Sequence, residues 1–227
     1  MGKILATFAT LAPFLGGALA DTWGPAFSLG PTSGAVIGTT YTFTSGTPPS
    51  PPEDALFLWV GISNATSGLI QAGTNQYSNM EAACGAANSQ WCVGASYFGI
   101  VDGQTTQLNG PVVAIDGSTP VYVDYSLSGN TWTQTVEVGG KVVSTVTTYD
   151  GPLLNGGWGT GTECQQNCRG TGDVQHYYDI TIYLSEADPN FKNTLGKGSG
   201  VVASDMETSD GGKTWTISSI TIPKYTA

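Results

Sequence analysis

Alternating hydrophobic and polar residues along the chain predict short β-strands separated by turns. Residues 39–44 (TTYTFT) alternate and run into a proline-rich connection at 45–52, which is too rigid to belong to a central strand. Residues 56–62 (LFLWVGI) form a continuous apolar run, typical of a strand covered on both faces. Six further strands are expected at 69–77, 121–127, 132–138, 142–148, 177–184 and 215–222.

Turn residues and the lack of a helical period narrow the fold class. Gly139-Gly140 between two of these strands is a two-residue hairpin loop, because glycine tolerates positive φ. Only residues 81–87 could hold a turn of helix. Many strands at this spacing without intervening helices predict an all-β sandwich. The length also fits a single domain of this class.

The first twenty residues have the pattern of a signal peptide. Lys3 is followed by an apolar run over 4–19, and Ala18-Leu-Ala20 supplies small residues where signal peptidase cleaves. We therefore expect residues 1–20 to be removed after Ala20, and residues 21–227 to form a single secreted, extracellular domain.

Composition agrees with secretion and excludes several partners. Only 11% of the residues are charged, and 7 Lys plus Arg against 17 Asp plus Glu leave a net charge of −10. So few positive charges predict that the protein binds neither nucleic acid nor an anionic membrane surface. We expect a monomer that needs no cofactor.

Four cysteines lie in the expected mature chain, as suits an oxidising compartment. Their spacing suggests bridges Cys84–Cys92 and Cys164–Cys168, although three pairings are possible from sequence. Neither spacing is that of a zinc site, and no other metal motif is present, so no metal is expected. Asn64 begins an N-glycosylation sequon in a predicted turn.

Few residues are placed for chemistry. His176 is the single histidine, and no GxSxG elbow accompanies it, which gives a serine triad little support. Gln71 stands in an otherwise apolar segment, and Glu163 stands beside a predicted disulfide. Considered without any comparison, each is more readily explained as a structural residue.

Two segments resemble a known family. WVGI at 59–62, followed by LIQAG at 69–73, is similar to the Trp-Val-Gly-Ile … Leu-Gln-Thr-Gly core of the glutamic peptidases (eqolisins), a fungal family of acid endopeptidases. The likeness continues in order along most of the chain beyond residue 21, which would make it a divergent fungal member. It implies a concanavalin A-like, jelly-roll-like β-sandwich of two antiparallel sheets.

The resemblance also implies roles for individual residues. Gln71 matches the family's catalytic glutamine and Glu163 its catalytic glutamate, while Trp23 and Trp59 match tryptophans of the substrate cleft. Tyr97, in a segment resembling Ala-Trp-Tyr-Glu-Trp, is a further substrate-binding candidate. A carboxylate base on water with an amide stabilising the oxyanion would hydrolyse a polypeptide without a metal or covalent nucleophile.

A carbohydrate-active or carbohydrate-binding sandwich is the alternative, with polysaccharide as its ligand. Aromatic side chains on strands can stack on sugars; the candidates are Tyr122, Tyr125, Trp132, Tyr177, Tyr178 and Tyr183. Strict alternation along 177–184 would place His176, Tyr178 and Ile180 together on one face. This alternative predicts a line of exposed aromatics with Gln71 buried or unpaired, whereas the peptidase prediction requires Gln71 and Glu163 together in an open cleft.

Overall fold

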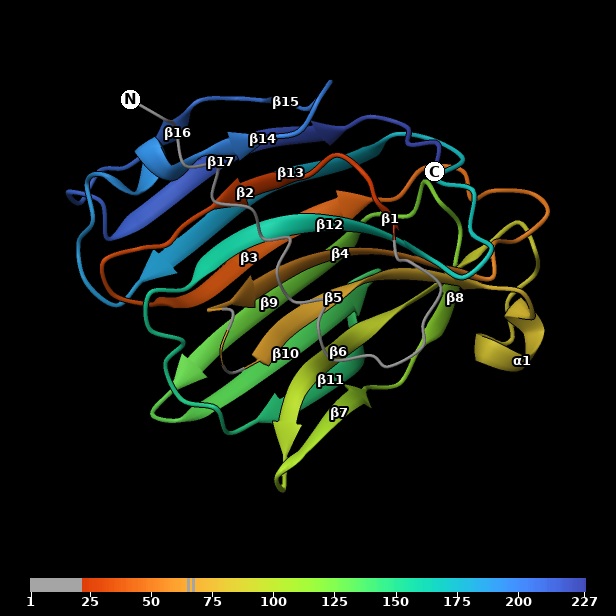
Figure 1. The fold of residues 1–227 in the computed structure, drawn as a ribbon, viewed down its shortest axis with the longest axis horizontal. Coiled ribbons are helices and arrows are strands. Elements are labelled where there is room, and N and C mark those ends of the chain that lie inside the picture. Colours follow the sequence, from red (N-terminus) through yellow and green to blue (C-terminus); the bar gives the residue numbers. More distant parts are fainter. Residues whose placement is uncertain (1–21, 65, 67) are drawn as a thin grey trace.

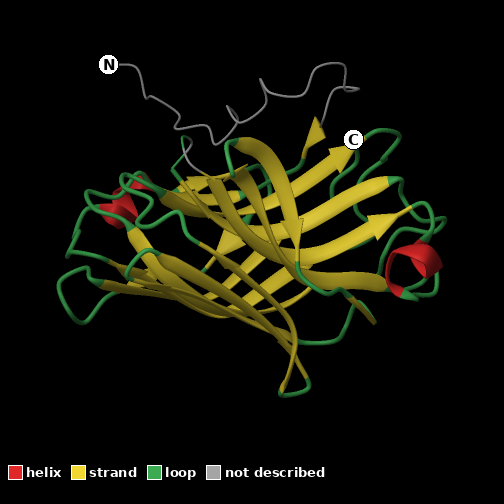
Figure 2. Cartoon of the chain, turned by 90° about the horizontal axis from the view of Figure 1, so that it is seen from below, coloured by secondary structure: helices red, strands yellow, loops and turns green. Residues whose placement is uncertain are grey.

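The computed structural model describes residues 22–64, 66 and 68–227, and these fold into two stacked antiparallel sheets (Figure 2). The nine-stranded sheet has the order β14-β2-β12-β4-β5-β6-β7, with β1 added beside β12 and β8 beside β6. Its strands are β1 (Thr22–Trp23), β2 (Phe27–Leu29), β4 (Ala55–Ser63), β5 (Gly68–Tyr77), β6 (Trp91–Val101), β7 (Gln104–Asn109), β8 (Val113–Ile115), β12 (Gly157–Gln165) and β14 (Gly196–Lys197).

The eight-stranded sheet has the order β11-β10-β9-β3-β13-β17-β15, with β16 also paired to β17 (Figure 1). Its strands are β3 (Val36–Thr44), β9 (Val121–Ser128), β10 (Thr131–Val138), β11 (Lys141–Thr148), β13 (Gln175–Leu184), β15 (Val202–Ala203), β16 (Met206–Glu207) and β17 (Thr214–Ile222). The predicted all-β sandwich of two antiparallel sheets is therefore confirmed. The helical segments are α1 (Met80–Cys84) and the 3-10 turn η1 (Phe191–Thr194).

The core lies between the sheets, where alternate residues of each strand point inward. On β4, Leu56, Leu58, Val60 and Ile62 are buried at 2% exposure or less. Phe57 and Trp59 point outward and are only half-buried, so the prediction that residues 56–62 are covered on both faces holds for the inner face alone. The outward positions of this strand form part of the candidate site.

A bulge in β13 changes which residues share a face. Asp179 has φ 51°, and the register with β3 shifts between Tyr178 and Thr181. Ile180 consequently turns inward, as Tyr177 does, with 1% and 2% exposure. The strict alternation expected from sequence, which grouped Ile180 with His176 and Tyr178, is wrong beyond the bulge.

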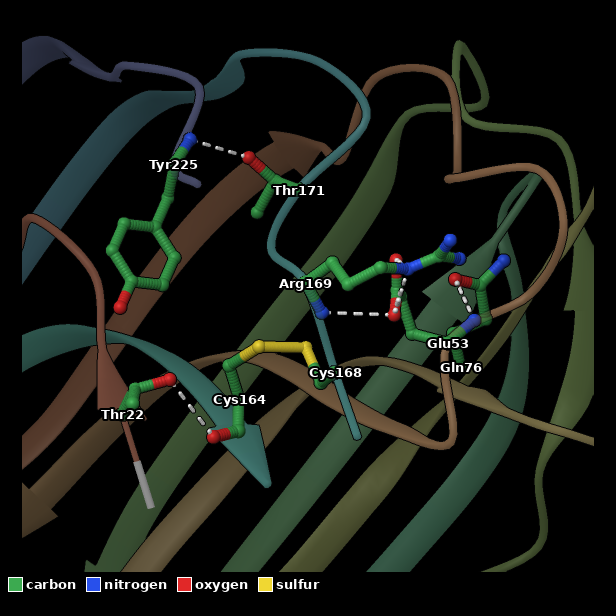
Figure 3. Close-up of a disulfide and its surroundings, with 8 residues drawn as sticks. All are labelled: Thr22, Glu53, Gln76, Cys164, Cys168, Arg169, Thr171 and Tyr225. Carbon is green, nitrogen blue, oxygen red and sulfur yellow. Dashed lines mark hydrogen bonds and ion pairs between the residues drawn. A yellow bond between two sulfur atoms is a disulfide. The ribbon is translucent and has the colours of Figure 1, made fainter. Parts of the chain in front are cut away.

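Both disulfides have the pairing expected from spacing. Cys84–Cys92 joins α1 to β6, and Cys164–Cys168 closes a turn at the end of β12 (Figure 3). The helical turn expected at 81–87 is α1: the Asn79 side chain accepts a hydrogen bond from the Ala82 N–H, and Gly85 ends the helix in the left-handed conformation. No helix in the described ranges is long and apolar enough to cross a membrane.

Candidate active site

Strands β12, β4 and β5 lie in the middle of the nine-stranded sheet (Figure 1). Their outward face holds Trp59 and Glu163, which sequence analysis singled out. Trp59 on β4 lies opposite Gly161 of β12 and Gly73 of β5. A Cβ at Gly161 would lie 2.3 Å from the nearest atom of the Trp59 ring, and one at Gly61 would lie 3.0 Å from it. The indole therefore rests on bare backbone, and only glycine leaves room for it.

Glu163, two residues along β12 from Gly161, is held by two side-chain N–H donors. The Trp59 indole donates to Glu163 Oε2 at 3.1 Å, and the Gln165 amide donates to Oε1. Residues at i and i+2 of a strand share a face, so Gln165 is placed beside Glu163 by the strand itself. Donors to both oxygens fix the orientation of the carboxylate.

Trp23 borders Glu163 on the other side. The short strand β1 pairs with the end of β12, so that Trp23 lies directly opposite Glu163. The Trp23 ring meets Trp59 edge to face, with centroids 6.1 Å apart, and remains 47% exposed. An exposed tryptophan that is held in place offers apolar contact area at small entropic cost, as binding sites require.

Gln71 projects from the same sheet but lies away from Glu163. Its register partners are Gly61 on β4 and Ser96 on β6, whereas Glu163 lies opposite Phe57. Four residues of β4 separate the two positions, which is about 13 Å along the strand plus two interstrand spacings of about 4.8 Å. The row between them carries Trp59. Gln71 Oε1 is buried without a hydrogen-bond partner in the described part of the chain.

Other candidates from the sequence lie elsewhere. Tyr97 is 1% exposed, points into the core and donates a hydrogen bond from its hydroxyl to Asp150. Burial, and to a smaller extent the contact with Asp150, raises the pKa of Tyr97 well above the usual range for tyrosine. It is therefore not on the face that carries Trp59. His176 stacks on Tyr178 in the opposite sheet. Asn64 lies in the turn after β4, where its side chain accepts a hydrogen bond from Thr66 N–H.

Gln165 is the residue of this site that the sequence interpretation did not single out. The signal was available, because a Glu and a Gln separated by one residue on a strand must share a face. It was hidden because 157–165 is so rich in glycine that it did not read as a strand. Among the residues that the structure describes, no group of three or more His, Cys, Asp or Glu side chains is arranged to hold a metal ion.

Comparison with known proteins finds solved structures of similar fold. No protein-family model matches the chain, and no curated protein matches it by sequence. Among solved structures, scytalido-glutamic peptidase with a transition state analogue inhibitor matches at 13% identity and TM-score 0.53, and a complex with a peptide-based analogue at 16% and 0.53. SCP-B, a member of the eqolisin family bound to the tripeptide Ala-Ile-His, matches at 14% and 0.50. Each alignment covers 87% of this chain and 98% of the other. The chain thus has the fold expected from the resemblance.

Proposed function

We propose that this protein is a secreted endopeptidase-like hydrolase that acts on polypeptides with Glu163 as its general base. The observation that carries the proposal is the setting of Glu163: a carboxylate held by the Trp59 and Gln165 N–H groups, beside the exposed Trp23, on the open face of a glutamic-peptidase fold. Solved relatives of this fold hold peptide-like ligands, which supports a polypeptide substrate.

The chemistry needs only these groups and water. The Glu163 carboxylate, oriented by these two donors, would bind the attacking water molecule. It accepts a proton from that water as the oxygen attacks the scissile carbonyl carbon. The proton then passes from Glu163 to the leaving nitrogen as the C–N bond breaks, which restores the carboxylate and releases an acid and an amine.

An amide N–H must stabilise the oxyanion of the tetrahedral intermediate, and the geometry favours Gln165 over Gln71 for this role. An oxyanion donor has to lie within about 3 Å of the oxygen that forms next to the attacked carbon. Gln165 contacts the carboxylate directly, whereas Gln71 is four residues of β4 away. Gln165 would exchange its bond to Glu163 for one to the oxyanion.

A second candidate function is polypeptide binding without cleavage. It is favoured by the distance of Gln71 from Glu163, since the resemblance expected those two residues to act together. Trp23 and Trp59 would still hold an extended peptide by apolar contact, with Glu163 accepting hydrogen bonds from its backbone N–H groups.

The experiment is digestion of a denatured protein substrate between about pH 2 and pH 5, the range in which a carboxylate base titrates. The parent is compared with Glu163→Gln, Gln165→Ala and Gln71→Ala, each checked for an unchanged circular dichroism spectrum and urea midpoint. We expect Glu163→Gln to lose at least about a hundredfold in rate, Gln165→Ala about a hundredfold, and Gln71→Ala little.

Other outcomes separate the alternatives. Loss in Gln71→Ala without loss in Gln165→Ala would return the oxyanion role to Gln71. A parent that cleaves nothing, but binds the denatured substrate more tightly than Trp23→Ala does, would establish the binding function instead. Full activity in Glu163→Gln would refute the general base.

A further inference from the structure

The outward face of the eight-stranded sheet carries three exposed tyrosines that the proposed function does not use. Tyr122 on β9 and Tyr178 and Tyr183 on β13 are 39%, 39% and 40% exposed. We call this surface the tyrosine face. By contrast, the other three aromatic candidates of this sheet are buried in the core at 2% exposure or less: Tyr125, Trp132 and Tyr177.

Register places two of these rings in one row. Tyr122 and Tyr178 are both partners of Thr42 on the intervening strand β3, so they project from the same face two interstrand spacings apart, about 9.6 Å. That spacing is close to the length of a disaccharide unit. His176 stacks against the Tyr178 ring, with centroids 6.0 Å apart, and this contact restricts the ring. Two exposed rings at this separation, one of them restricted, suit the apolar faces of a pyranose chain.

Four threonines and one aspartate form the next row of the same face. Its members, taken in order across β10, β9, β3, β13 and β17, are Thr135, Asp124, Thr40, Thr181 and Thr216. A threonine hydroxyl can both donate and accept, as a ligand covered with hydroxyls requires. The Thr216 hydroxyl already donates to the Glu207 carbonyl, so it would serve such a ligand as an acceptor. The row continues into a groove of ≈ 560 Å³, which Thr181 and Thr216 line together with Asp179, Asp205 and Glu207.

Acidic side chains lie beside Tyr122 and along the groove. Asp124 and Glu137 flank Tyr122, and burial together with the repulsion from Glu137 raises the pKa of Asp124 above its usual value. No Lys or Arg of the described chain forms an ion pair with these carboxylates or with those of the groove; the ion pair present, Arg169 with Glu53, lies elsewhere. A cationic ligand would relieve the repulsion, whereas a uronate polymer would increase it.

We infer that the tyrosine face and its groove form a second binding site, for a polysaccharide of hexosamine units that carry free amino groups. The tyrosine rings contact the pyranose faces, the threonines bind the hydroxyls, and the carboxylates pair with the ammonium groups. Ammonium groups close to a ring gain further from cation–π attraction. The site lies on the opposite sheet from Glu163, so its test does not depend on whether the hydrolase proposal is correct.

The test is titration of the full-length secreted protein with glucosamine oligomers, matched against N-acetylglucosamine and glucose oligomers of the same length. Calorimetry or fluorescence at about pH 5 keeps the amino groups charged, since that is well below the usual pKa of an amine. We expect the glucosamine oligomer to bind at least tenfold more tightly than either control and to weaken as salt is added.

Variants connect binding to the face. Tyr122→Ala and Tyr178→Ala should each lower affinity about fivefold, since a cation over an exposed ring contributes on that order. Asp205→Asn with Glu207→Gln should remove the salt dependence contributed by the groove. Tyr149→Ala is the matched control, because Tyr149 is 76% exposed and follows β11 outside both sheets.

Two results would overturn the inference. One is equal affinity for the glucosamine oligomer and the two neutral oligomers, including no binding of any of them. The other is an affinity of Tyr122→Ala and Tyr178→Ala no lower than that of Tyr149→Ala, with the urea midpoint unchanged in all three.

Discussion

Glu53 fastens the proline-rich connection between the sheets to the segment that follows the Cys164–Cys168 turn (Figure 3). Its carboxylate, 3% exposed, accepts a hydrogen bond from the Arg169 backbone N–H at 2.9 Å and lies 3.3 Å from Arg169 Nε. Its own backbone N–H donates to Gln76 Oε1 at 3.0 Å. The Arg169 side chain, in contrast, is 63% exposed.

These contacts predict unequal effects of removing the two partners. Glu53→Ala leaves the part-buried Arg169 N–H without its acceptor, which costs about 1 kcal/mol, and deletes buried side-chain atoms as well, so we expect a loss of about 3 kcal/mol in the free energy of unfolding. Arg169→Ala keeps the backbone bond and removes only a largely exposed ion-pair partner, so we expect about 1 kcal/mol or less.

The assay is urea denaturation of the oxidised protein, followed by tryptophan fluorescence, with the slope of the transition checked for constancy. Glu53→Gln is the matched control, because its amide oxygen still accepts from the Arg169 N–H while the charge is lost; it should resemble Arg169→Ala. The reasoning is refuted if Arg169→Ala destabilises the protein as much as Glu53→Ala does, since the ion pair rather than the backbone bond would then hold the connection.

Three further predictions concern the site, acid stability and the disulfides. Gly161→Ala should displace the Trp59 ring, cost about 1–3 kcal/mol in urea denaturation and reduce polypeptide digestion or binding; unchanged activity would contradict the packing described. The pKa of Asp210 is lowered to about 2, mainly by the hydrogen bond from Thr214 N–H and further by those from Thr208 and Lys213. The ionised Asp210 therefore stabilises the fold above the unfolded pKa near 4. This stabilisation is lost as the pH falls through about 2. The urea midpoints of the parent and Asp210→Asn should therefore converge as the pH falls from about 4 to about 2. A difference that stays constant over this pH range would refute the prediction. Replacing Cys84 and Cys92 by alanine should lower the free energy of unfolding by about 2–3 kcal/mol, because the unfolded chain gains conformational freedom. The same denaturation assay measures this loss. An unchanged free energy of unfolding would show that the disulfide does not stabilise the protein.

Strong periodic signals in the sequence were sufficient for much of the sandwich. The apolar run at 56–62 became β4 with one added residue at each end, and Gly139-Gly140 turns with φ of 59° and 73° as a hairpin loop should. β12 was not predicted because three of its five outward positions are glycine, which has low strand propensity. That strand forms because tertiary contacts, above all the Trp59 ring, occupy the space where side chains would be.

The site was harder to predict than the fold because it depends on register. Trp23, Trp59 and Glu163 lie together in the structure, although they are far apart in sequence. Gln71 shares their sheet, but a displacement of four residues along β4 separates it from Glu163, and residue order alone does not fix such a displacement. The bulge at Asp179 shows the same limit, since one extra residue reassigns every later side chain of a strand.

The central pairings of both sheets have a consequence for how the chain acquires its structure. β4 pairs with β12, and β3 pairs with β13, so strands roughly one hundred or more residues apart in sequence form the middle of each layer. During synthesis neither sheet can be completed until the last third of the chain has emerged. Until then, the early strands have edges without a hydrogen-bonding partner strand. Folding dominated by such non-local pairing is slow, in the range of milliseconds to seconds. Chains truncated before residue 175 should consequently aggregate rather than yield a smaller stable domain.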